Sequence, residues 1–251
     1  MSAHHVEHCM GTVFSIDVRD AGPWDDAIAE VVAWLHHVDA VFSTYQDGSD
    51  ISRIRRGELA AADADPGVLP VLALGTEIEA ETGGWFSVFP GGDLDPTGLV
   101  KGWAIERASG ILLDHGSRNH AVNGGGDVQL AGEADPGHPW TVGVADPHDR
   151  SHVLTTLTGR DFAIATSGTA ERGAHIVDPR TGAPAGALAS VTVVGRWLSR
   201  VDAYATAAFA RGAGARDWIE GVGGYEAVLV GLDGETTVTS GFATPDRTPA
   251  A

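Results

Sequence analysis

The sequence predicts a fold with both α-helices and β-strands, and two kinds of apolar pattern carry that prediction. Apolar and polar residues alternate through residues 10–18, as in a strand with one buried face. Through residues 24–41 the apolar residues recur at helical spacing, which predicts an amphipathic helix. Further helices are expected at 67–81 and 201–211, and buried strands at 191–195 and 227–231. These segments are interspersed without the regular spacing of βαβ units, so the pattern predicts a fold of helices and strands that is not a regular series of βαβ units.

Length and composition predict one compact unit. The chain has 251 residues, of which 43% are hydrophobic and 20% charged, enough to bury a substantial core. We find no internal repeat and no linker. We therefore expect a single domain over residues 1–251, with residues 1–9 and 244–251 flexible.

The net charge excludes two classes of partner. Lys and Arg number 16 against 34 Asp and Glu, so the formal charge is -18. Such a chain repels nucleic-acid phosphates and anionic lipid headgroups over most of its surface. An anionic ligand would have to be held by a metal ion or by local hydrogen-bond donors.

The N-terminal region and the single cysteine leave two alternatives open. Cys9 cannot form an internal disulfide, and a small half-buried side chain at the start of a strand is favoured over a catalytic thiol. His4, His5 and His8 are expected to be solvated rather than metal-bound. No secretory signal and no stretch of about 20 apolar residues is present, so a cytoplasmic location without stable membrane insertion is expected.

Two pairs of polar residues suit phosphate and metal chemistry. On a helix, Asp202 and Thr206 lie at i and i+4 and project from one face, where their oxygens can meet a hard cation such as magnesium. On spacing alone, a local hydrogen bond or a helix cap is the more common explanation. Asp95 and Lys101 lie near an expected helix N-terminus, which favours phosphate, although on this segment alone an ordinary surface ion pair is the more common explanation.

The glycine-rich segment and the serine and histidine candidates do not match the motifs of three common enzyme classes. The segment Asn123-Gly-Gly-Gly-Asp looks like a strand end turning through accessible glycines. It has neither the spacing of a Rossmann dinucleotide fold nor that of a phosphate loop. Ser167 lacks the nucleophile elbow of a hydrolase, and His175 is either a general base or, more commonly, a satisfied core histidine.

In their order along the chain, these motifs resemble the FAD:protein FMN transferase family, also called the ApbE family. The matching segments are Met10-Gly-Thr, Ser43-Thr-Tyr-Gln-Asp-Gly-Ser-Asp-Ile-Ser-Arg, Asp95-Pro-Thr-Gly-Leu-Val-Lys-Gly-Trp-Ala, Asn123-Gly-Gly-Gly-Asp, Ala165-Thr-Ser-Gly, His175-Ile-Val-Asp-Pro-Arg-Thr-Gly and Asp202-Ala-Tyr-Ala-Thr-Ala. The resemblance runs from Met10 to about Gly241. It implies an α+β fold with a mixed β-sheet core, flanking helices and a ligand cleft between two lobes.

The resemblance also implies roles for individual residues. Asp202, Thr206 and the backbone carbonyl of Gly98 would bind magnesium, and His175 would be the base, with Lys101 holding the pyrophosphate. The residues expected to contact FAD are Met10, Tyr45, Trp85, Phe86, Ser87, Asp95, Lys101 and Ile176. Ser87 replaces an acid of the family pattern, and Pro96 and Thr97 replace Leu-Gly, so the adenine side of the pocket departs most from the family.

The activity implied is a magnesium-dependent transfer of FMN from FAD to a threonine hydroxyl of an acceptor protein, with release of AMP. The alternatives are an FAD pyrophosphatase that releases FMN and AMP, and a non-catalytic FAD-binding protein.

Overall fold

The computed structural model describes residues 1–168, 176–179 and 181–242, and an eight-stranded sheet forms its centre. The strand order is β1-β2-β3-β4-β7-β8-β9-β10, and every pair in it is antiparallel. The strands are β1 (Ala3–Cys9), β2 (Thr12–Val18), β3 (His120–Gly124), β4 (Asp127–Ala131), β7 (Ala163–Gly168), β8 (Leu188–Gly195), β9 (Glu226–Gly231) and β10 (Thr236–Val238). Helices and strands together confirm the α+β class.

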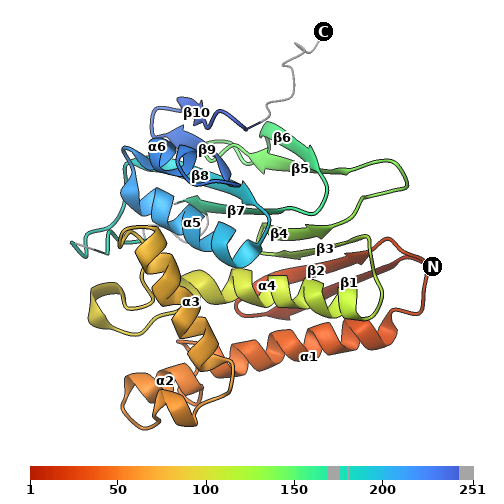
Figure 1. The fold of residues 1–251 in the computed structure, drawn as a ribbon, viewed down its shortest axis with the longest axis horizontal. Helices are drawn as coiled ribbons and strands as arrows, with labels where there is room; N and C mark the ends of the chain where they lie inside the picture. The colour runs from red at the N-terminus through yellow and green to blue at the C-terminus, as the bar shows by residue number, and fades with distance from the viewer. Residues whose placement is uncertain (169–175, 180, 243–251) are drawn as a thin grey trace.

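Helices cover one face of this sheet. The helices α1 (Asp25–Phe42), α4 (Thr97–Asp114) and α5 (Leu198–Arg211) lie across it, as Figure 1 shows. The remaining elements are α2 (Asp50–Arg55), α3 (Val68–Glu81), α6 (Ala215–Glu220) and two 3₁₀ turns at Ala61–Asp63 and Pro90–Gly92. Among the described residues, none of these helices has the length and apolar character needed to cross a bilayer.

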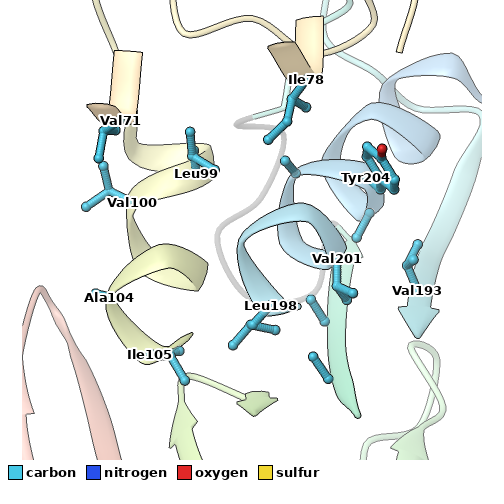
Figure 2. Close-up of a cluster of buried hydrophobic side chains, with 14 of the residues drawn as sticks. Val71, Ile78, Leu99, Val100, Ala104, Ile105, Val193, Leu198, Val201 and Tyr204 are labelled. Atoms are coloured by element: carbon cyan, nitrogen blue, oxygen red, sulfur yellow. The ribbon is translucent and has the colours of Figure 1, made fainter. Parts of the chain in front are cut away.

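The main core lies between the helices and the sheet. Leu99 and Ile105 of α4 and Leu198 of α5 lie between these two helices, whereas Val201 of α5 lies on the side toward Val193 of β8 (Figure 2). All of these side chains are fully buried. The apolar periodicity of both helices therefore has a packing explanation, and burial of each such side chain contributes about 1.5–3 kcal/mol.

A second, smaller core covers the opposite face of the sheet. The antiparallel pair β5 (Trp140–Ala145) and β6 (Val153–Gly159) packs Trp140 and Val144 against Leu130 and Ile164. Ile164 belongs to this core, whereas its neighbours in β7 belong to the main one, since successive strand residues point to opposite faces. Strand β4 is consequently buried throughout.

The first nine residues correct one expectation. We expected them to be flexible, but Ala3–Cys9 form β1, which pairs with β2 along its whole length. The cause is a two-residue turn at Met10 and Gly11, with φ of 51° and 69°, that folds the chain back onto β2. Cys9 therefore ends a strand rather than starting one. The expectation for residues 244–251 lies outside the described residues.

A second tight turn, between β3 and β4, sets the position of Asp127. Gly125 and Gly126 connect β3 to β4 with φ of 61° and 93°, a conformation that favours glycine. A side chain at Gly125 would come within 2.8 Å of Thr12 Oγ1, so the turn packs closely against the start of β2. The turn places Asp127 at the first position of β4, at the end of the sheet where the helix α4 begins.

Candidate functional site

A cavity of about 700 Å³ opens at this end of the sheet. Most of its wall comes from the β3–β4 turn, the end of β7, the loop before α4, the facing sides of α4 and α5, and residues 142–147 of β5 and the loop beyond it. The described lining also includes Gly11 and Thr12 at the β1–β2 turn, Ile176, Val177 and Pro179, and Ser190 of β8. Its size is in the range of small-molecule and cofactor sites.

The N-terminus of α4 forms one wall. Asp95 Oδ1 accepts hydrogen bonds from the Thr97 backbone N–H at 3.0 Å and from Thr97 Oγ1 at 2.6 Å, which fixes this carboxylate at the first turn of the helix. Gly98 lies in the same turn, and a Cβ built on it would stand 4.0 Å from Thr206 Cγ2. The first turn of α4 and the middle of α5 therefore meet inside the cavity.

Lys101, one helical turn further along α4, lies between two buried carboxylates. Its Nζ donates to Asp202 Oδ2 at 3.0 Å and also contacts Asp127 Oδ2. The two aspartates are 7% and 4% exposed, respectively. Lys101 is the only lysine in the chain, and every other basic side chain is an arginine or a histidine. One compact ammonium group thus joins α4, α5 and β4.

Helix α5 contributes Asp202 and Thr206 to the cavity, as their spacing predicts. Asp202 Oδ2 also accepts the Gly102 backbone N–H at 3.1 Å, and Thr206 Oγ1 lies 3.3 Å from Ser167 Oγ. The hydrogen bonds that Asp202 accepts from the described part of the chain both go to Oδ2.

The cavity gathers most of the residues singled out from the sequence. They are Trp85, Phe86, Ser87, Asp95, Gly98, Lys101, Ile176, Asp202 and Thr206. Met10 does not line the cavity, although Gly11 and Thr12 next to it do. Tyr45 does not either: it stands in the loop between α1 and α2 with 92% of its surface exposed. His175 lies outside the described residues.

Other lining residues were not among the candidates. Asp127 ends the glycine segment that begins at Asn123, whose Oδ1 accepts the Gly126 backbone N–H at 3.1 Å. The sequence pattern of that segment marks the glycines of a turn and gives no role to the acid after them. The lining residues of β5 and of the loop beyond it, from Val142 to Pro147, include one acid, Asp146, but match no sequence motif.

The described lining of the cavity carries more acidic than basic side chains. It has four carboxylates, Asp95, Asp127, Asp146 and Asp202, and two cationic side chains, Lys101 and Arg150. Within the described ranges, no group of three or more His, Cys, Asp and Glu side chains is arranged to hold a metal ion. A cation at Asp202 would thus need further ligands from elsewhere, such as water or ligand oxygens.

Fold and cavity together define an α+β protein with a binding site at the end of an antiparallel sheet, beside a helix N-terminus. The family model described as the ApbE family matches residues 10–92 and 87–229. The chain belongs to the ApbE family.

Two curated relatives carry the name FAD:protein FMN transferase. The one from Rhodobacter capsulatus is 30% identical over 239 residues, which cover 91% of this chain and 42% of that protein. The one from Vibrio cholerae is 32% identical over 123 residues, covering 45% of this chain and 37% of that protein. The aligned part of this chain thus spans less than half of either relative's length.

Solved structures share the fold. The flavin transferase ApbE from Vibrio cholerae superposes with a TM-score of 0.85 at 21% identity, covering 96% of this chain and 98% of that one. The ApbE protein from Thermotoga maritima gives a TM-score of 0.85 at 23% identity, covering 96% and 97%.

Proposed function

We propose that this chain transfers FMN from FAD to a threonine hydroxyl of an acceptor protein, with magnesium as the metal. The observation that carries the proposal is the position of Lys101, held beside Asp202 in a cavity that opens at the N-terminus of α4. An ammonium group and a helix N-terminus are two features that bind phosphate groups. Membership of the ApbE family supports FAD as the phosphate-bearing ligand.

The flavin and adenine ends of FAD would lie along the aromatic part of the lining. Trp85 and Phe86 belong to the loop before α4, and Ile176 is a further apolar residue of the lining. Planar rings bind such surfaces through stacking and apolar contact. Lys101 would then face the pyrophosphate between the two ends.

The chemistry of the cavity oxygens fits magnesium. Asp202 offers a carboxylate oxygen, Thr206 a hydroxyl and Gly98 a backbone carbonyl, all hard oxygen donors of the kind magnesium prefers. With one carboxylate among them, the remaining ligands would be water and the pyrophosphate. When bound, the metal would neutralise charge on the pyrophosphate, which this acidic cavity cannot do by itself.

The proposed reaction exchanges one phosphorus–oxygen bond for another. The acceptor hydroxyl oxygen attacks the phosphorus on the FMN side, its proton passes to a base, and the bond to AMP breaks so that AMP leaves with the electron pair. Lys101 holds the pyrophosphate in line for that attack. The family resemblance suggests His175 as the base.

The test separates transfer from hydrolysis and from binding alone. The chain is incubated with FAD and magnesium chloride, with and without a flavin-accepting protein, and with that protein carrying valine at its target threonine. We expect AMP release together with covalent flavin fluorescence only on the unmodified acceptor. AMP and free FMN in equal amounts without an acceptor would instead identify a pyrophosphatase, and intact FAD would identify a binding protein.

A further inference from the structure

Asp127 is a buried acid of the cavity to which the proposed reaction gives no role. It begins β4 directly after the Gly125–Gly126 turn and is 4% exposed. A carboxylate taken so far out of water is costly unless its oxygens are paired. Both of its oxygens have a partner, and these partners indicate what it does.

One oxygen of Asp127 connects β4 to β7 beyond the last backbone pair of these two strands. The strands β4 and β7 pair at Gln129 with Ala163 and at Val128 with Ile164, and their register ends there. Beyond that point Asp127 Oδ1 accepts the Thr166 backbone N–H at 3.0 Å. The side chain is thus fixed at the place where the two strands separate and the cavity begins.

The other oxygen of Asp127 faces Lys101. Oδ2 contacts the ammonium group, whose other carboxylate contact within the described ranges is Asp202 Oδ2 at 3.0 Å. The side chain of Lys101 is 21% exposed, and it lines the cavity together with both acids. Asp127 is the one of the two that has no other cavity task, because Asp202 is also the proposed magnesium ligand.

We infer that Asp127 is a positioning residue that acts through Lys101 and holds its ammonium group toward the pyrophosphate. The inference rests on the proposed function for the identity of the ligand, but not for the contact itself. Without Asp127, Lys101 would have Asp202 as its only carboxylate partner in the described cavity and would compete with a cation for it.

Replacing Asp127 by asparagine isolates this role. Asp127→Asn keeps the volume and an oxygen that can accept the Thr166 N–H, but it removes the charge that faces Lys101. Asp146→Asn is the matched control, since Asp146 also lines the cavity and its side chain bonds the His148 backbone N–H rather than Lys101.

The two variants should differ in their affinity for FAD. The affinity is measured by a flavin-fluorescence titration at a fixed magnesium concentration. Asp127→Asn should raise the dissociation constant about tenfold, equivalent to about 1.4 kcal/mol, because the amine is no longer held. Asp146→Asn removes one negative charge and should bind FAD at least as tightly. Equal tightening by both variants would overturn the inference, since it would show a general field effect.

A double-mutant cycle with Lys101→Met tests whether Asp127 acts through the lysine. In the Lys101→Met background, Asp127→Asn should cause no further loss of FAD affinity. Losses that multiply would show that Asp127 supports the site independently of Lys101, and the inference would fail.

A second readout needs no flavin, so it separates failure of this inference from failure of the proposed function. Because Lys101 is the only lysine, an amine-acylating reagent reports on it alone apart from the N-terminus. Peptide mass spectrometry should find Lys101 acylated several-fold faster in Asp127→Asn than in the wild type or in Asp146→Asn. Equal rates in all three would overturn the positioning role, even if the wild type transfers FMN.

Discussion

The carboxylate of Asp202 on α5 accepts the backbone N–H of Gly102 on α4 at 3.1 Å. The two helices approach so closely here that a Cβ on Gly102 would stand 2.7 Å from the Leu198 carbonyl oxygen and 2.8 Å from Asp202 Cβ. Glycine at this position therefore sets the distance between the two helices that supply Lys101 and Asp202 to the cavity.

Gly102→Ala is expected to separate these helices and weaken the site. Overpacking of this kind costs about 1–3 kcal/mol of unfolding free energy, and FAD binding should fall as well because Asp202 and Lys101 shift. Chemical denaturation and a fluorescence titration with FAD measure the two effects.

The matched control for this substitution is Gly110→Ala on the same helix. A Cβ there would meet only the flexible Arg107 side chain, at 3.3 Å from Nη1. Alanine is favoured over glycine in a helix by about 1 kcal/mol, so Gly110→Ala should be neutral or stabilising. A loss at Gly110 equal to that at Gly102 would contradict the close-approach explanation.

Local patterns predicted the helices α1 and α3 for a simple reason. The apolar stripes of residues 24–41 and 67–81 are long enough that no other structure buries them, and α1 and α3 form there. Residues 3–9 were misjudged because β1 gains its stability from pairing with β2, and pairing depends on the turn at Met10 and Gly11 rather than on the strand's own composition.

The site was predictable only where its parts are close in sequence. Asp202 and Thr206 share one face of a helix, so their spacing reveals them. The contact of Lys101 with Asp202 joins residues 101 positions apart, and no periodicity links them. No local pattern marks Asp127, because its partners come from two other elements. The motif around Tyr45 predicts a ligand contact, although Tyr45 does not line the cavity.

Asp202→Asn is expected to remove the magnesium dependence of AMP release together with most of the activity. Loss of the only carboxylate in the proposed ligand set should cost about 100-fold or more, since changes behind a metal ligand already cost 10–100-fold. Activity is measured as AMP formed across a magnesium titration. The control Asp217→Asn changes an acid that is 81% exposed on α6 and should match the wild type; a wild-type magnesium curve for Asp202→Asn would exclude the proposed metal site.

Cys9 is expected to be chemically inert in the folded protein. Burial, with a smaller contribution from the charge of Asp39, raises the pKa of its thiol to about 11, and Sγ contacts the Leu35 carbonyl oxygen at 3.4 Å. At pH 8 little thiolate forms, so a disulfide reagent should label Cys9 only after the protein unfolds. Cys9→Ala should retain full FAD-dependent activity. Loss of activity in that variant at unchanged stability would instead indicate that the Cys9 thiol is catalytic.

His120 is expected to make the fold sensitive to acid. It is fully buried, with Ser109 Oγ 2.7 Å from Nε2 and Ser117 Oγ 2.9 Å from Nδ1. Burial lowers the pKa of His120 from 6.5 to about 4, against a smaller opposing effect of Asp20 and Asp161. Between these two values the unfolded chain binds more protons than the folded one, so stability falls as the pH falls from about 6.5 to 4.

The size of that loss is on the order of 3 kcal/mol, from 1.36 kcal/mol for each unit of pKa difference. Urea denaturation at a series of pH values measures it, and His120→Gln should flatten the curve over this interval by about that amount. The exposed His138, whose Nδ1 contacts the Pro136 carbonyl oxygen, provides the control His138→Gln, which should leave the slope as in the wild type. An unchanged slope in His120→Gln would mean that other groups produce the acid sensitivity.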